Sequence, residues 1–461
     1  MKMEVDVSLR ERLESVNSTS TTPSAEAATS RTAIARSNQA YQELKSHLHK
    51  VLLDRIDLEA MEKLTPDRLL AELRSMVESL LQAENIVVNE IERRSLVRDI
   101  QYEMMGLGPL EPLLSDNTVS DILVNNAHQV YVERAGRIEL TDVTFVNDAH
   151  LMKIIDKIVS RVGRRIDESS PMVDARLPDG SRVNAIVPPL ALDGPVLSIR
   201  RFASIPLTMN NLVEYKTLVP EMAELLAGLT RAKINILISG GTGSGKTTLL
   251  NILSSYIPDN ERIITIEDAA ELQLQQPHVV RLETRPSNIE GKGEVTQRAL
   301  VRNSLRMRPD RIILGEVRGA EAFDMLQAMN TGHEGSMSTV HANSSRDALM
   351  RLENMLGMAG LNSTPKVMRA QIASAINIVV QVARLSDGKR KVIGLQEVTG
   401  MEGDMITMQE IFSFRQTGVS ETGVVQGYFS ASGVRPKFGE RLRAHGILLA
   451  DSLFDPSRRY E

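Results

Sequence analysis

The chain has 461 residues, which is enough for two or three domains with cores of their own. Its net charge is −5 and its sequence pI is about 6.0, so no overall positive field favours nucleic acid as a partner. It contains no cysteine, which excludes disulfides, thiolate metal ligands and cysteine nucleophiles. The N-terminus lacks the apolar core of a secretory signal, and no uncharged apolar run approaches the roughly 20 residues of a membrane-spanning helix. We therefore expect a soluble, cytoplasmic protein that could still dock on a membrane complex.

The N-terminal part of the chain predicts a tail followed by a helical module. Residues 1–38 are rich in Ser, Thr and Ala and poor in large apolar side chains, which predicts a disordered tail. Leucines then recur at helical spacing, and Thr65-Pro66 supplies an N-cap and a first-turn proline for a second helix. Asn89 can cap a third. We expect a helical module over 39–105 whose charged residues form a solvated face.

Residues 106–205 have the pattern of a smaller α+β domain. Short β-rich runs alternate there with turn residues, and one stretch has helical periodicity. Arginines stand near the ends of the predicted strands, at Arg176, Arg182 and Arg200. The local pattern by itself favours surface ion pairing for them. A polar stretch at 206–219 is expected to be the linker to the next domain.

A complete phosphate-loop motif, G-x-x-x-x-G-K-T, follows the apolar run 234–238. Its glycines let backbone N–H groups approach phosphate oxygens, and the helix that follows favours anions at its N-terminus. Lys246 is expected on the β and γ phosphates and the Thr247 hydroxyl on Mg²⁺. A glycine hairpin without a ligand would have no use for these two side chains. The predicted nucleotide-binding residues are Gly240, Gly241, Thr242, Gly243, Ser244, Gly245, Lys246, Thr247 and Thr248.

Two later apolar runs end in acidic residues, Glu267 and Glu316. Strands alternate with helices over 220–461, which predicts an α/β domain whose parallel sheet binds ligands at the carboxyl ends of its strands, followed by a C-terminal strand meander. Both acids would then reach the edge that carries the phosphate loop. One could hold Mg²⁺ and the other polarise water, but the spacing does not assign the two roles. A lone acid at a strand end is otherwise a helix cap or an ion-pair partner.

The segment between the two acids is basic, and Arg298, Arg302 and Arg306 fall on one helical face. A salt-bridged surface is the first interpretation, a subunit contact the second, and a nucleic-acid patch the last, because aromatics are few. His333 and His341 are eight residues apart, which is not the spacing of an H-E-x-x-H zinc site. Their segment is expected to face the same sheet edge as the phosphate loop, although either histidine alone is more often structural.

These motifs resemble those of the ATPases of type II and type IV secretion systems, and among them the CpaF-like ATPases that power tight-adherence pili. Four motifs carry the resemblance: the phosphate loop, an acidic box at 266–271, an atypical Walker B motif at 313–318 and a histidine box at 333–341. It covers about residues 96–415. The resemblance implies a RecA-like phosphate-loop domain, preceded by the smaller α+β domain as a cover for the nucleotide.

The resemblance also implies roles for individual residues. Glu316 would be the Walker B acid that acts on Mg²⁺, and Glu267 would orient the attacking water. The histidines of the box would sense or position the γ-phosphate, and arginines of the smaller domain would close over the phosphates. The implied catalytic residues are Glu267, Glu316, Lys246, His341, His333, Arg182, Arg200 and Arg176, and the implied metal ligands are Thr247 and Glu316.

The function that follows from the resemblance is a hexameric, ATP-hydrolysing motor at the cytoplasmic face of the inner membrane. It would drive assembly of a tight-adherence pilus, and could drive its retraction, by acting on membrane platform proteins without direct contact to nucleic acid. ATP is expected rather than GTP because the chain lacks an N-K-x-D guanine motif. The alternatives are a type IV secretion ATPase that moves protein or DNA, and a nucleotide-gated scaffold. A small-molecule kinase is disfavoured because no acceptor-binding lid is evident.

Overall fold

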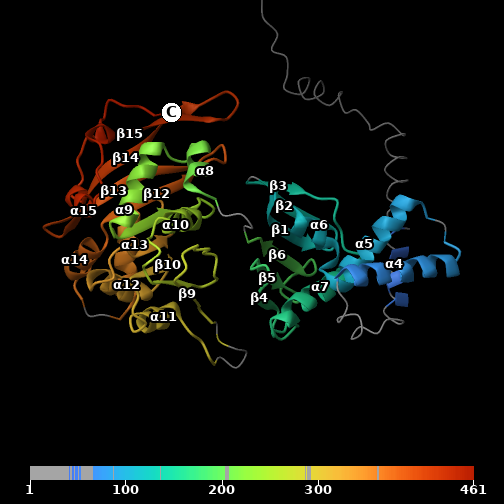
Figure 1. Ribbon diagram of the computed structural model, residues 1–461. Helices are drawn as coiled ribbons and strands as arrows, with labels where there is room; N and C mark the ends of the chain where they lie inside the picture. The colour runs from blue at the N-terminus through green and yellow to red at the C-terminus, as the bar shows by residue number, and fades with distance from the viewer. Residues whose placement is uncertain are drawn as a thin grey trace, which may run out of the picture. The chain divides into compact units, whose positions relative to one another are not determined.

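The structure, a computed structural model, describes residues 41–52 apart from 42, 43, 46 and 50, and residues 66–460 apart from 87, 135, 203–206, 286, 288–291 and 361–362. The predicted tail at 1–38 lies outside these residues. Contacts divide the chain into two units, whose elements are labelled in Figure 1. The first unit contains the described residues up to Arg134, with Ile138–Ala175 and Asn184–Ile199. The second contains 136–137, Arg176–Val183 and the described residues from Arg200 onward.

The first unit begins with helices that share a small apolar core. Helices α4 (Pro66–Ala83) and α5 (Glu90–Met105) contribute to it together with Leu48 and Leu52. The predicted cap of α5 is confirmed, because the Asn89 side chain and Glu92 form a reciprocal capping box.

A buried carboxylate fastens this helical part to the elements that follow it. Glu103, near the end of α5, accepts from Lys45 Nζ at 2.9 Å and lies 2.9 Å from His150 Nε2 of helix α7 (Asp148–Arg161). Burial opposes ionisation of Glu103, but His150 and Lys45 outweigh it and lower its pKa to about 2. Residues on either side of the expected boundary at 105/106 are therefore joined in one unit.

Most of the rest of the first unit belongs to a six-stranded sheet with the order β3-β2-β1-β6-β5-β4, although strand-end residues at 137, 176, 182–183 and 200 are grouped with the second unit. Helix α7 buries one apolar face through Leu151, Ile155 and Ile158. The strands are β1 (Val119–Asn126), β2 (Gln129–Arg134), β3 (Arg137–Leu140), β4 (Met172–Arg176), β5 (Arg182–Ile186) and β6 (Val196–Arg200), and η2 (Gly108–Leu110) and α6 (Glu111–Ser115) precede them.

The second unit is an α/β structure around a nine-stranded sheet with the order β15-β14-β13-β12-β7-β11-β10-β8-β9. The strands from β12 to β9 in this order are parallel, and β12 to β15 form an antiparallel meander. The predicted α/β fold with a parallel core is confirmed. The strands are β7 (Ile236–Gly240), β8 (Ile263–Glu267), β9 (Val279–Glu283), β10 (Arg311–Val317), β11 (Met337–Val340), β12 (Ile378–Arg384), β13 (Arg390–Glu402), β14 (Met405–Val419) and β15 (Val425–Ala431). The helices are α8 (Met209–Glu214), α9 (Pro220–Arg231), α10 (Lys246–Ser254), α11 (Gln297–Ser304), α12 (Glu321–Asn330), α13 (Ser345–Met358), α14 (Pro365–Ala375), α15 (Gly439–Ala444) and η3 (Asp451–Phe454).

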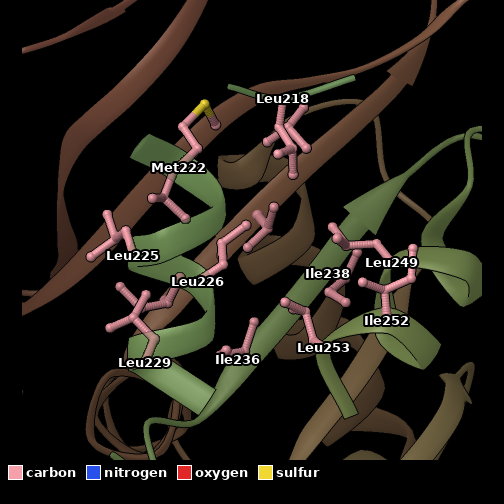
Figure 2. Close-up of a cluster of buried hydrophobic side chains, with 14 of the residues drawn as sticks. Leu218, Met222, Leu225, Leu226, Leu229, Ile236, Ile238, Leu249, Ile252 and Leu253 are labelled. Atoms are coloured by element: carbon pink, nitrogen blue, oxygen red, sulfur yellow. The ribbon is translucent and has the colours of Figure 1, made fainter. Parts of the chain in front are cut away.

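Helices cover both faces of the parallel strands, which is why those strands are apolar throughout. Successive side chains of β7 enter different cores: Ile236 and Ile238 join one cluster and Leu237 the other. Helices α9 and α10 pack on the first face, and α12, α13 and α14 on the second. The first cluster is drawn in Figure 2, where the labelled residues include Met222, Leu225 and Leu229 of α9, Ile236 and Ile238 of β7, and Leu249 and Leu253 of α10.

Two stretches differ in detail from the sequence pattern. The stretch 206–219 contains a helix in its described residues, because Thr208 caps α8 and the Met209 and Leu212 side chains are buried in the first core cluster. Its two neighbouring asparagines have low helix propensity, so the sequence pattern did not indicate this short helix. The basic stripe is also shorter than expected, since α11 ends at Ser304, and Arg298 donates from Nε to Asp324 Oδ2 at 2.8 Å.

Within the described residues, no helix combines the length and the apolar character that crossing a membrane requires.

One buried ion pair provides a test of the fold. Arg311 is fully buried at the start of β10, bonds Glu261 through Nε at 2.6 Å and Nη2 at 3.0 Å, and donates to the Thr230 carbonyl oxygen at 2.7 Å. We expect Arg311→Ala to lower the free energy of unfolding by about 3 kcal/mol, because it leaves the buried Glu261 carboxylate with the more distant Lys233 Nζ, 3.6 Å away, in place of the close guanidinium. Urea unfolding measures the loss. The control, Arg302→Ala, removes an exposed arginine and should stay within about 0.5 kcal/mol of the wild type; an equal loss in both variants would contradict this assignment.

Candidate nucleotide site

The phosphate loop connects β7 to α10. Gly240 ends the strand, and a Cβ there would lie 2.3 Å from the Val382 carbonyl oxygen, so a larger residue does not fit. Gly243 and Gly245 have φ angles of 68° and 96°, in the left-handed region that glycine adopts without strain. Gly245 is the N-cap of α10, whose first backbone N–H groups have no partner within the helix. The turn therefore offers N–H groups and a helix dipole to an anion.

Lys246 is the first residue of α10. Its Nζ donates to the Gly241 carbonyl oxygen at 2.9 Å, and Ser244 Oγ donates to the same oxygen at 2.8 Å. Burial lowers the pKa of Lys246, and the charge of Glu316 opposes this. The predicted cation and the predicted Walker B acid are thus electrostatic neighbours.

Glu267 is the last residue of β8 and is 3% exposed. Its Oε2 accepts the N–H groups of Glu271 at 2.7 Å and Leu272 at 2.9 Å, while its Oε1 has no hydrogen-bond partner among the described residues. Burial raises the pKa of Glu267 to about 7, against the effect of the two N–H groups. One oxygen is fixed, and the other is available to orient a water molecule near neutral pH.

Glu316 lies near the end of β10, with its side chain 24% exposed. Its Oε2 accepts from Arg318 Nη2 at 2.7 Å, and Arg318 Nη1 lies 3.4 Å from Asp268 Oδ2. Arg318 thus connects the Walker B motif to the acidic box. It is absent from the predicted site, although its place two residues after the Walker B acid could have indicated it, because side chains two apart along an extended chain share a side.

Strand register brings the two acids to one edge. Strands β10 and β8 are parallel, with Leu314 opposite Ile266, so the two acids stand at the same end of their strands. A Cβ on Gly315 would lie 2.9 Å from Glu267 Cγ, which shows that Glu267 packs closely against β10. The expectation that both acids and the phosphate loop share the carboxyl edge of the sheet is met by this geometry.

The two histidines of the box lie at opposite edges. His341 follows the carboxyl end of β11, where burial and then the charge of Lys246 lower its pKa and Glu316 opposes them. His333 precedes β11, which runs parallel to β7, so it lies at the edge away from the phosphate loop. The expectation that the whole segment faces the edge with the phosphate loop is therefore wrong for His333. Strand β11 lies between the two histidines, and its length across the sheet separates them.

The predicted arginines at the ends of β4, β5 and β6 belong to the second unit by their contacts. Arg176 bonds Glu283 Oε1 at 3.0 Å, the ion pairing that the local pattern favours. The second unit also contains a pocket of about 230 Å³, whose lining includes Arg176, Arg182, Arg200, Thr247, Thr248 and Asn251.

The candidate Mg²⁺ ligands are oxygen donors. Among the described residues, no group of three or more His, Asp or Glu could hold a metal ion. The Thr247 hydroxyl and the Glu316 carboxylate instead fit Mg²⁺ that arrives with a nucleotide, because this ion commonly takes one or two protein ligands and completes its shell with phosphate and water.

A buried parallel strand, a glycine turn and a helix that starts with lysine define a phosphate-loop nucleotide-binding protein. The profile of the family described as "Type II/IV secretion system protein" matches residues 103–429. The chain belongs to this family.

Curated relatives agree with this assignment. A putative conjugal transfer protein of Mycobacterium tuberculosis is 37% identical over 323 residues, which cover 69% of this chain and 91% of that protein. Conjugal transfer protein TrbB of Rhizobium radiobacter is 33% identical over 295 residues, covering 63% and 86%. Type IV secretion system protein VirB11 of Bartonella quintana is 31% identical over 322 residues, covering 62% and 90%.

The raised pKa of Glu267 predicts a dependence of stability on pH. Its pKa is ordinarily 4.5 and is about 7 in the folded protein, so the folded state binds the additional proton between these values. Stability contributed by this proton is present below pH 4.5 and is lost as the pH rises through 7. Relative to Glu267→Gln, we expect the wild type to lose about 1 to 3 kcal/mol across this window, measured by urea unfolding. Glu421→Gln, at an exposed position, should keep the wild-type profile; parallel curves for wild type and Glu267→Gln would show that the carboxyl ionises normally.

Proposed function

We propose that this chain is an ATP-hydrolysing motor of a type IV secretion machine that moves protein or DNA. The observation that carries the proposal is the placement of Glu267 and Glu316 at the sheet edge where the phosphate loop lies. Relatives named for conjugal transfer and type IV secretion support this function and favour it over the expected tight-adherence pilus. We therefore propose type IV secretion in place of the tight-adherence pilus.

The chemistry we propose is in-line attack of water on the γ-phosphorus of ATP. Lys246 and the loop N–H groups neutralise charge that develops on the phosphoryl oxygens. The free Oε1 of Glu267 aligns the water, and its raised pKa makes it a better base than an exposed carboxylate. Mg²⁺, when bound, supplies further positive charge on the phosphates, with Thr247 and Glu316 as the residues that would hold it.

Two other groups complete the proposed site. His341, at the same edge, is proposed to sense the γ-phosphate, and Arg182, Arg200 and Arg176 to stabilise its charge. His333 is left out because of its position before β11.

The proposed assembly is a homo-hexamer that works with inner-membrane proteins of the machine from the cytoplasmic side. The division into a tail at 1–38, a helical module at 39–105, a covering domain at 106–205 and a motor domain at 220–461 is part of this proposal. Its support is the unit boundary near Arg200 and the family match that begins at residue 103.

Substitutions in the site provide the biochemical test. Lys246→Ala should lower steady-state phosphate release by at least about 100-fold, because it removes the cation that stabilises the transferred phosphoryl group. Glu267→Gln and Glu316→Gln should retain ATP binding and lose hydrolysis to a similar degree. Phosphate release and equilibrium binding of a fluorescent ATP analogue measure the two properties separately.

The control is Arg443→Ala, an exposed residue of α15, which should hydrolyse ATP as the wild type does. Normal turnover by Lys246→Ala would contradict the proposal. Activity that is low at every protein concentration would instead favour a nucleotide-gated scaffold, since a ring motor gains activity as it assembles.

The choice of machine is tested in the producing cell. With Lys246→Ala in place of the wild type, we expect transfer of the secreted protein or DNA to fall by at least about tenfold in cells whose surface pili are unchanged. Transfer counts and electron microscopy measure the two outcomes. Loss of pili with normal transfer would restore the tight-adherence assignment.

A further inference from the structure

The β12–β13 hairpin ends beside the phosphate loop. Strand β12 is parallel to β7, and Val382 lies opposite Gly240, the first glycine of the loop. The carboxyl end of β12 is Arg384, and the chain returns with Arg390 directly opposite it. The hairpin therefore delivers two arginines to the edge of the sheet that carries the proposed nucleotide site.

Arg390 contacts the loop backbone directly. Its Nε donates to the Gly243 carbonyl oxygen at 2.9 Å. A Cβ on Gly245 would lie 3.4 Å from Arg390 Cδ, so the stem of the arginine passes beside the next glycine. A Cβ on Gly243 would lie 3.9 Å from Arg384 Nη1. The glycine turn is thus flanked by side chains that are about 140 residues further along the chain.

The hairpin that carries Arg390 is held in place at its turn. The N–H of Leu385 donates to the Lys389 carbonyl oxygen at 2.8 Å, and Asp387 Oδ1 accepts the Lys389 N–H at 3.0 Å. Asp387 Oδ2 accepts the Val425 N–H at 3.1 Å, which ties the turn to the start of β15. Both carboxylate oxygens of Asp387 are used, one within the turn and one across to the meander.

The hydrogen bond from Arg390 to the Gly243 carbonyl restrains a peptide group that could otherwise rotate. Glycine changes backbone conformation at little cost, and a loop carbonyl that turned toward a phosphate would place its oxygen against negative charge. A guanidinium bonded to the Gly243 carbonyl opposes this rotation. The N–H groups of the turn then keep the orientation that phosphate requires.

We propose that Arg390 is a positioning residue of the nucleotide site, and that the β12–β13 hairpin, fixed to β15 through Asp387, is the arm that carries it. This inference rests on the proposed function, since it concerns the same phosphate loop. It assigns a task to a residue outside the four motifs of the sequence, and it predicts that nucleotide affinity depends on the C-terminal meander.

The test compares Arg390→Ala with the wild type. We expect the KM for Mg-ATP, and the Kd for a fluorescent ADP analogue with Mg²⁺, to rise roughly three- to tenfold, because a charge-assisted bond at an exposed site is lost. The kcat should stay within about twofold, because the groups that act on the γ-phosphate remain. Arg390→Lys keeps a cationic donor and should recover most of the affinity. Asp387→Ala should raise KM in the same direction by freeing the turn.

Controls separate the possible outcomes. Arg443→Ala removes the same charge from α15 and should leave KM and Kd unchanged. Melting temperatures without nucleotide should be alike for wild type, Arg390→Ala and Arg443→Ala. If wild type binds nucleotide and Arg390→Ala matches Arg443→Ala, the inference fails while the proposed function stands. If Arg390→Ala instead lowers the melting temperature and kcat at constant KM, Arg390 is a structural brace and the inference is overturned. A wild type that binds no nucleotide would defeat the proposed function itself.

Discussion

The parallel pairing of β7, β11, β10 and β8 is the constraint on which the rest of the second unit depends. Parallel strands end at a common edge of the sheet, so the segments at their carboxyl ends lie along that edge. The phosphate loop and His341 follow strands of this group, and the two acids lie at the ends of two others. Helices on both faces make the pairing stable, because each strand is apolar on both sides and is buried between two cores.

The same burial that stabilises the sheet gives Glu267 its chemical character. A carboxylate at the end of a fully buried strand loses hydration, and its pKa rises to about 7. Two backbone N–H groups hold one of its oxygens and leave the other without a protein partner among the described residues. The burial of this carboxylate lowers the stability of the fold, and it also provides a group that can bind and release a proton near neutral pH. Gly315 makes this possible by leaving room for the side chain on β10.

The two edges of the parallel sheet have different tasks. At the carboxyl edge the Glu316 side chain is partly exposed, and Arg318 links the two acidic motifs. At the amino edge Arg311 is fully buried with Glu261, and its Nη1 also reaches the Gly335 carbonyl oxygen. His333 belongs to this second, structural edge. In the first unit Glu103 has a structural role comparable to that of this ion pair, since it joins three segments through Lys45 and His150.

The sequence by itself determined the α/β class, the phosphate loop, the acids at the strand ends and the family, because each depends on residues that are adjacent in the chain. The tertiary structure alone decided that α8 is part of the core, that His333 lies at the far edge, and that Arg318 bridges the two acidic motifs. It also decided that Arg390 reaches Gly243, a contact between residues 147 apart. Such contacts depend on the order in which strands enter the sheet, and local spacing carries no information about that order.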